Sequence, residues 1–329
     1  QSCAPCPVPC PQSRAPCPVP CPQSCAPCPE SRALCPEMVA QSNGWRYFGH
    51  VIPEAGDLDI ASYIDGLAAR GRYHFTTAEA VAALGSSPVA ARAAIRRQGE
   101  KGRVAMPFRT FHVIVPPEYR ALGCLPADQF VPQLMEHLGQ VYYAGLLTAA
   151  SLHGAAHQAP MVFQVVVAQN RAEIRCGRVR VEFAARANVG DVPTIERNTL
   201  RGVLRVSTPE ATAFDLTGYP SRAGGLSNVA TVLAELAESM DAARLRAEAD
   251  RSPLPWAQRL GYLLERVGAL PLAAPLAEYV SKKAKEYVPL RTRKPVARAS
   301  RAPRWRLLVN EEVEAESATA GGSAARSSR

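Results

Sequence analysis

The sequence predicts an α+β protein with a small helix-turn-helix and hairpin unit, a larger mixed α/β domain after it, and disordered termini. Three observations support this prediction. Residues 75–115 read as a helix, a tight turn, a basic helix and a hairpin, and residues 142–315 mix short apolar strands with helical periodicity. Both ends of the chain are too biased in composition to bury a core.

The first helix of the small unit is predicted to begin at Thr76 or Thr77, because a hydroxyl accepts a hydrogen bond from an unpaired backbone N–H group. Glu79 follows in the first turn, where the helix dipole favours a carboxylate. Gly85 comes after the apolar residues of this helix. Glycine can end a helix there because it adopts the left-handed conformation without a steric penalty. A further helix is predicted before this one, at residues 58–70.

The second helix is predicted to begin at Ser86 or Ser87, with Pro88 at its first position, and to end near Lys101 and Gly102. One of its faces is small and apolar, although it includes a glutamine where a leucine would pack better. This face consists of Ala91, Ala94, Ile95 and Gln98. The opposite face carries three arginines and consists of Val89, Arg92, Ala93, Arg96 and Arg97.

Two of these arginines are the candidates for reading bases. Arg92 and Arg96 lie one turn apart, and on a helix in the major groove they would reach guanine edges. Ser87 and Val89, at the start of the same helix, belong to the same expected DNA-facing surface. An isolated basic helix is more often a solvated face, but the turn and hairpin around this one favour DNA binding.

A β-hairpin is predicted next, with strands at residues 104–106 and 111–115 and a turn at residues 107–110. Arg109 lies on this turn, where a wing would contact the DNA backbone or minor groove. Three further basic residues are assigned to phosphates: Arg97, Lys101 and Arg103. Residues 58–116 are therefore predicted to form a winged helix-turn-helix.

The formal net charge of +9 agrees with a polyanionic partner. The longest apolar runs, such as residues 161–168, are too short to cross a membrane, so no membrane association is expected.

The N-terminal segment, residues 1–37, contains eight of the ten cysteines within an imperfect repeat that begins QSCAPCPVPCP. The dense prolines exclude helices and sheet ladders. Cys3–Cys6 and Cys25–Cys28 have CxxC spacing, but prolines fill the gaps and no histidine accompanies them, so neither zinc nor a disulfide framework is expected. Because the first methionine is Met38, the segment is interpreted as a disordered tail or an over-extended reading frame.

A helical connection is predicted at residues 117–141, with Phe130, Leu134 and Leu138 on one face. The second domain, residues 142–315, is predicted to open with a helix from Tyr142 to about Gly154. Its expected strands lie at residues 162–168, 178–184, 203–206 and 305–310. Its expected helices lie from Thr208 and at residues 228–239, 241–249, 255–267 and 272–287. The tail at residues 316–329 is predicted to be disordered.

The sequence lacks a complete catalytic or metal-binding pattern. His153 and His157 are four residues apart, but HGAAH has no glutamate between them and no clear third ligand, so a structural role is favoured. The sequence has no GxxxxGK phosphate loop and no nucleophile elbow. Asp215 is interpreted as a capping or packing residue rather than a general base. We therefore expect no enzyme activity, no metal and no cofactor.

Several long, ordered blocks carry a resemblance to a known family. They are VIVPPEYRALG at 113–123, YYAGLLTAASLHGAAHQAPMVFQVV at 142–166, LRVSTPEATAFDL at 204–216, GGLSNVATVLAELAE at 224–238, PWAQRLGYLLE at 255–265 and RWRLLVN at 304–310. Over roughly residues 58–315 the chain resembles the AbiEi antitoxins of type IV toxin–antitoxin systems. The blocks are not a catalytic signature.

The resemblance implies a cytoplasmic protein with two roles. Its winged helix would repress its own operon by binding inverted repeats in the promoter, and its second domain would counteract a nucleotidyltransferase-like toxin, as in plasmid maintenance and abortive infection against phage. In the type IV scheme the antitoxin forms no stable complex with the toxin, so direct binding stays open. Two alternatives also stay open: a stand-alone regulator with a ligand-sensing second domain, and a nucleic-acid-processing enzyme.

A basic run at residues 282–306 has three interpretations. It is a solvated linker, a secondary contact to DNA phosphates, or a contact to the toxin or its RNA substrate. The residues that would make such a contact are Arg291, Arg293, Lys294 and Arg298.

Overall fold

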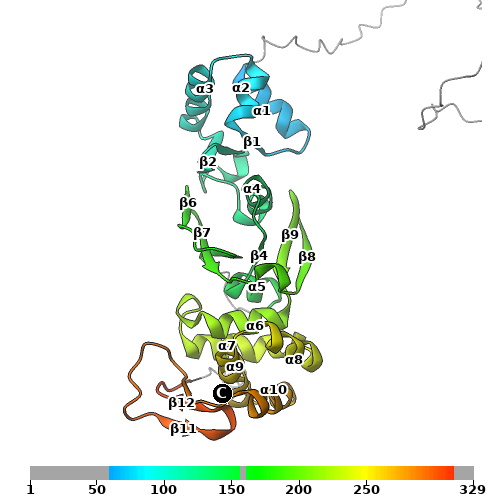
Figure 1. Ribbon diagram of the computed structural model, residues 1–329. Coiled ribbons are helices and arrows are strands. Elements are labelled where there is room, and N and C mark those ends of the chain that lie inside the picture. Colours follow the sequence, from blue (N-terminus) through cyan, green and yellow to red (C-terminus); the bar gives the residue numbers. More distant parts are fainter. Residues whose placement is uncertain (1–58, 156–160, 315–329) are drawn as a thin grey trace, which may run out of the picture. The chain divides into compact units, whose positions relative to one another are not determined.

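The computed structural model describes residues 59–155 and 161–314. Within these residues it contains ten α-helices and three β-sheets, which confirms the predicted α+β class (Figure 1). The predictions for residues 1–37, for residues 316–329 and for His157 fall outside the described ranges. No helix in the described ranges is long and apolar enough to cross a membrane.

The first part of the described chain combines three helices with a three-stranded antiparallel sheet in the order β1-β3-β2. The elements are α1 (Ile60–Ala69), β1 (His74–Thr76), α2 (Thr77–Leu84), α3 (Pro88–Glu100), β2 (Val104–Phe108) and β3 (Phe111–Ile114). A small core shared by the helices and the sheet holds them together, with Ile64, Phe75 and Ile95 buried at its centre.

The predicted boundaries of α2 and α3 are confirmed. They could be predicted because a capping residue or a glycine marks each of them locally. Thr76 caps α2 and forms a reciprocal pair with Glu79, in which each side chain accepts from the other residue's backbone N–H group. Gly85 ends α2 with a φ of 55°. Ser87 caps α3 by accepting from the N–H group of Ala90, at 3.2 Å.

The hairpin differs from its prediction. Strand β2 continues through Pro107 to Phe108, so the turn is confined to Arg109 and Thr110 rather than residues 107–110. The pairing register shifts between Ala105 and Phe108. This irregularity accommodates Pro107, which has no N–H group to donate to the ladder. Strand β1 was not predicted; it is three residues long and pairs only with β3 in the described sheet.

The connection at residues 117–141 is less helical than predicted. It contains two 3-10 turns, Pro117–Tyr119 and Ala127–Gln129, and one short helix, α4 (Val131–His137). Phe130 and Leu134 are buried as expected, whereas Leu138 is only partly buried. Prolines along the segment favour turns over one continuous helix.

The second part of the chain is built on a six-stranded mixed sheet in the order β6-β7-β5-β4-β9-β8. Its strands are β4 (Tyr142–Ala144), β5 (Phe163–Val167), β6 (Ile174–Cys176), β7 (Val179–Ala185), β8 (Thr194–Thr199) and β9 (Gly202–Ser207). The predictions of β5, β7 and β9 are confirmed, but the two edge strands, β6 and β8, were missed. Strand β6 has only three residues, and β8 contains a single apolar residue, Ile195, so neither has an apolar run that would indicate a strand.

The predicted helix from Tyr142 is wrong at its start. Tyr142, Tyr143 and Ala144 form a central strand that is buried on both faces, and α5 (Leu146–Leu152) begins only after Gly145. A short apolar run does not distinguish a buried strand from a buried helix. Gly145 is needed at the turn, because a Cβ atom there would lie 2.7 Å from the side chain of Val166.

Five helices gather on one side of this sheet (Figure 1). They are α6 (Pro209–Gly218), α7 (Leu226–Leu236), α8 (Ala242–Arg251), α9 (Leu254–Arg266) and α10 (Leu270–Lys283), close to their predicted positions. Alternate strand residues divide between two cores: Tyr143 and Val166 pack with the helices, whereas Tyr142 and Val165 pack with the connection and with β3. The second core therefore joins the hairpin to the sheet.

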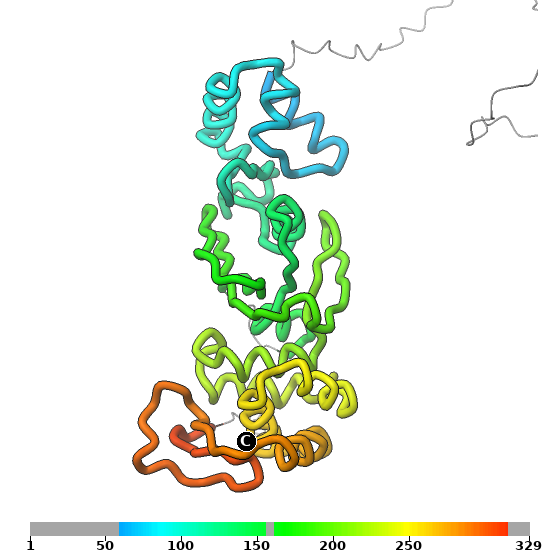
Figure 2. Tube along the Cα trace, viewed as in Figure 1, coloured from blue at the N-terminus to red at the C-terminus, as the bar shows by residue number. Residues whose placement is uncertain are grey.

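The basic run at residues 282–306 is a solvated linker only in its middle, residues 292–298, which are exposed; both ends form regular structure, which corrects that part of the interpretation. It forms β10 (Val288–Pro289) and β11 (Ser300–Ala302), which flank β12 (Leu307–Val309), and Figure 2 shows the chain doubling back through this region. Trp305, expected at the start of the last strand, lies instead in a 3-10 turn. It is buried against Gly261, where a Cβ atom would come within 1.9 Å of the indole ring.

Candidate nucleic-acid interface

Helix α3 has one buried and one exposed face, as its sequence predicted. Ala91, Ile95 and Gln98 are buried, and Ala94 is half-buried. On the other face Val89 is 74% exposed, unusual for a large apolar residue, and all three arginines are exposed. Gln98 is tolerated inside because its side-chain oxygen is 3.5 Å from the guanidinium of Arg103, at the limit of a hydrogen bond.

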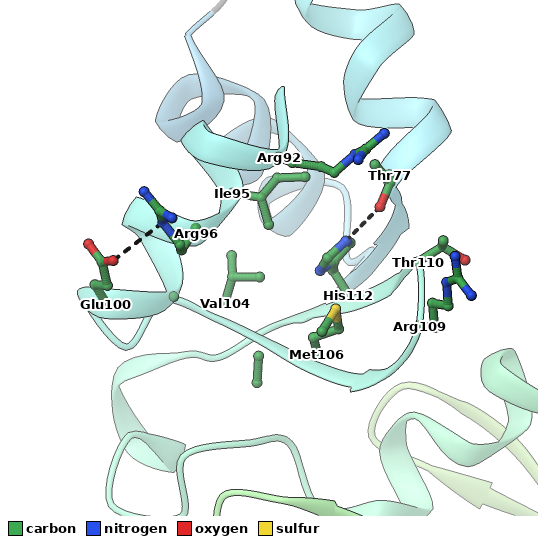
Figure 3. Close-up of a pocket in the computed structure, with 12 residues that line it drawn as sticks. Thr77, Arg92, Ile95, Arg96, Glu100, Val104, Met106, Arg109, Thr110 and His112 are labelled. Atoms are coloured by element: carbon green, nitrogen blue, oxygen red, sulfur yellow. Dashed lines mark hydrogen bonds and ion pairs between the residues drawn. The ribbon is translucent and has the colours of Figure 1, made fainter. Parts of the chain in front are cut away.

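A pocket of about 780 Å³ lies between α3 and the hairpin (Figure 3). Ile95, Val104 and Met106 give it an apolar lining. Three predicted site residues also line it: Arg92, Arg96 and Arg109. The fold thus brings the arginines of the helix and the arginine of the turn to one concave surface.

The two arginines on α3 differ in their surroundings. Arg96 points toward Glu100 and lies 3.6 Å from it, but both side chains are mostly exposed, so this pair contributes little. Arg92 points to the other side of the pocket, and no carboxylate in the described residues pairs with it or with Arg109. Their charges are free to meet an anion.

The remaining predicted phosphate contacts also divide into two kinds. Arg97 and Lys101 are exposed near the end of α3. Arg103 is half-buried and forms an ion pair with Asp65 of α1, besides its contact with Gln98. Its guanidinium is occupied inside the unit. Ser87 is exposed, with its hydroxyl engaged in capping α3.

His112 lines the same pocket and was not singled out from the sequence. It lies within the apolar run of β3, and its ring stacks on Phe75 with 5.2 Å between centroids. Nε2 shares a hydrogen bond of 2.9 Å with the hydroxyl of Thr77, whereas Nδ1 has no partner among the described residues. Burial lowers the pKa of His112 to about 4, so the ring is neutral at pH 7.

The basic loop between β10 and β11 contains the second group of predicted contacts. Arg291 and Lys294 share the carboxylate of Glu311, at 3.9 and 3.5 Å. Arg293 and Arg298 are exposed and have no carboxylate partner in the described ranges. Of these four residues, Arg293 and Arg298 are the freest to meet an outside anion.

A buried polar network occupies the interior of the second part. Arg186, at the end of β7, donates to Asp215 at 2.9 Å and to Glu248 at 2.7 Å. Asp215 also accepts from the hydroxyl of Tyr143, at 2.9 Å. Asp215, interpreted from the sequence as a capping or packing residue, is fully buried within this network. Burial raises the pKa of Asp215 to about 6, although the charge of Arg186 acts in the opposite direction.

His153 is partly buried and hydrogen-bonded within the fold. Its Nε2 atom is 2.8 Å from the carbonyl oxygen of Ser207, and burial lowers the pKa of the ring. No group of three or more histidine, cysteine, aspartate or glutamate side chains is arranged to hold a metal ion within the described residues.

Residues 143–266 match the family model described as the AbiEi antitoxin C-terminal domain. This segment therefore carries an AbiEi antitoxin C-terminal domain. It runs from β4 to the end of α9 and includes the whole Arg186 network.

A solved structure with the same fold is the crystal structure of RV2827C protein from Mycobacterium tuberculosis, which is 19% identical in sequence. The similarity covers 75% of this chain and 89% of the solved chain, with a TM-score of 0.53. At this identity it shows the fold alone. No curated protein matches the chain.

Proposed function

We propose that this protein combines two activities: its second domain, residues 142–315, counteracts a nucleotidyltransferase-like toxin, and residues 58–116 act as a winged helix-turn-helix that represses the operon by binding inverted repeats. The observation that carries the DNA-binding half is the exposed basic face of α3 beside the turn that bears Arg109. The AbiEi match at residues 143–266 supports the antitoxin half.

The charges on this face support binding to DNA. Exposed guanidinium groups that have no internal partner gain most from phosphates, because binding releases the counterions of the DNA without breaking an ion pair. Arg92 and Arg109 meet this condition within the described residues, and Arg96 nearly does because its pair with Glu100 is exposed.

Residue roles follow from these positions. Arg92 and Arg96 contact base edges in the major groove, with Ser87 and Val89 at the leading end of the helix. Arg97, Lys101 and Arg109 contact phosphates. Arg103 instead ties the turn between α3 and β2 to α1 through Asp65. Inverted repeats require two copies of the chain on one operator, one for each half-site.

In this proposal the second domain opposes the toxin through a rigid surface and not through a catalytic centre. The Arg186 network ties β7 to α6 and α8 through Asp215 and Glu248. Such a network fixes α6 and α8 against the end of β7. We propose that the toxin's effect is opposed from this domain and that DNA binding is not required for it.

The test separates the two activities in one strain. The full chain is co-expressed with the toxin encoded beside it, together with a reporter driven by the operon's promoter. Arg92→Gln is expected to relieve repression and to keep growth rescue, whereas Arg244→Gln, on the exposed face of α8, should alter neither. Repression that survives Arg92→Gln and Arg96→Gln together would disprove the assigned DNA interface, and failure of the full chain to rescue growth would disprove the antitoxin role.

A further inference from the structure

The two cysteines outside the N-terminal repeat lie next to each other in the fold. Cys124 and Cys176 are the only cysteines in residues 36–329. Cys124 belongs to the connection and Cys176 ends β6, and both are buried as free thiols in the core that joins the hairpin to the sheet.

The backbone around them fixes the alignment. The N–H group of Arg178 donates to the carbonyl oxygen of Leu122 at 2.7 Å, and a Cβ atom on Gly177 would lie 2.8 Å from the Cα atom of Gly123. Leu122 therefore lies beside Arg178 and Gly123 beside Gly177, in a contact between two turns whose glycines have left-handed φ values of 68° and 57°.

The two segments run in opposite directions through this contact, so the next residue on each is a cysteine. Both thiols lie in the same buried cluster, and a hydrogen bond between them acts on the pKa of each. A disulfide bridge spans Cα atoms about 4.4–6.8 Å apart, and cross-linking tests whether this pair reaches that separation.

The two thiols are not equivalent. The Cys124 thiol donates its hydrogen bond to Cys176, which lowers the pKa of Cys176, and the backbone N–H group of Met106 acts in the same direction. The same hydrogen bond and burial raise the pKa of Cys124. Cys176 is thus the sulfur that becomes a nucleophile first, and it touches the hairpin whose neighbouring turn carries Arg109.

We propose that Cys124 and Cys176 are a thiol–disulfide modification site that peroxide oxidises, and that the disulfide lowers DNA affinity by shifting the hairpin at Met106. Cys176 attacks one peroxide oxygen, which gives a sulfenic acid and one water. The Cys124 sulfur then attacks the sulfenic sulfur and displaces the second water. Overall, two thiols and one hydrogen peroxide give one disulfide and two waters.

Access to the buried pair is provided by the edge of the sheet. Strand β6 is three residues long and pairs only with β7 in the six-stranded sheet. Short edge strands open at a lower free energy than central ones, so peroxide reaches Cys176 during local opening. Bond formation shortens the sulfur–sulfur separation to about 2.05 Å and removes the thiol that accepts from Met106.

The first measurement is chemical and independent of DNA. The full-length chain, with its eight N-terminal cysteines replaced by serine, is treated with hydrogen peroxide and digested without reduction. A peptide that joins Cys124 to Cys176 and weighs two hydrogens less than its parts is expected, and Cys124→Ser should instead leave a sulfenic acid that dimedone traps on Cys176. Oxidation that leaves both thiols free, or that goes to sulfinic acid without a cross-link, overturns the modification site.

The second measurement, on operator DNA, rests on the proposed function. The oxidised chain is expected to bind about fivefold or more weakly than the reduced chain, at the low end of coupling between two sites. Dithiothreitol should restore binding, and Cys176→Ser should respond to neither reagent. A cross-link with unchanged affinity overturns the coupling to the hairpin. A cross-link in a chain whose reduced form binds no operator overturns the proposed DNA binding and leaves the modification site standing.

Discussion

The arginines of this protein occupy two opposite environments. Arg92 is exposed on α3, and no carboxylate in the described residues pairs with it, whereas Arg186 is buried between Asp215 and Glu248. Burial lowers the pKa of Arg186, but the two carboxylates outweigh this and raise it, so its charge is permanent and fully compensated. Net charge alone therefore does not locate an interface; the arginines that matter for binding are those that the fold leaves uncompensated.

The largest expected effect comes from removing the buried arginine, Arg186. Arg186→Met removes the cation and leaves Asp215 and Glu248 buried without it. The free energy of unfolding should fall by roughly 3–5 kcal/mol, the usual cost of an uncompensated buried charge. Urea denaturation measures this change. Arg92→Met and Arg244→Met are the matched controls on exposed faces. A similar loss of unfolding free energy in either control would contradict the difference between buried and exposed arginines.

The second effect is a pH dependence of stability caused by His112, which lines the same pocket as the exposed arginines. The pKa of folded His112 is about 4, below its unfolded value of about 6.5, so between these values the unfolded chain binds a proton that the folded chain does not. Stability should therefore fall as the pH drops from 6.5 to 4, by up to about 3 kcal/mol.

The measurement for His112 is urea unfolding at pH 7 and pH 4.5. His112→Gln keeps a polar group near Thr77 but cannot titrate, and it should flatten the difference between the two pH values. His74 and His153 also have pKa values lowered by burial and remain in both proteins, so only the change between variants is diagnostic. An equal pH dependence in the wild type and His112→Gln would disprove the role of His112.

These contrasts separate what the sequence encodes locally from what it does not. The caps at Thr76 and Ser87 and the left-handed Gly85 are confirmed because each depends on residues within one helical turn. Strand β4 was mistaken for the start of a helix because burial on both faces hides the period of a strand. His112 and the Cys124–Cys176 pair depend on contacts between distant segments, which no local pattern reports.

The third effect concerns operator affinity. Arg92→Gln should lose on the order of 1–3 kcal/mol of binding free energy and relax specificity at one base pair. Arg97→Gln should weaken binding to all sequences alike and reduce the slope of log K against log salt by about one. Fluorescence anisotropy with operator and scrambled duplexes over a range of salt concentrations distinguishes the two. Equal losses on both duplexes for Arg92→Gln would assign it to phosphates instead.

The smallest effect belongs to Arg103, which stands between the two environments. The sequence assigned it to a phosphate, but its guanidinium is paired with Asp65 and is half-buried. Because Asp65 is largely exposed, Arg103→Gln should lower the free energy of unfolding by about 0.5–1 kcal/mol, as for a partly screened pair. Its salt slope on operator DNA should equal that of the wild type, unlike that of Arg97→Gln. A salt slope reduced by about one would mean that Arg103 leaves Asp65 for a phosphate when DNA binds. Arg103 would then belong with the arginines that contact DNA, and its pairing with Asp65 would hold only in the free protein.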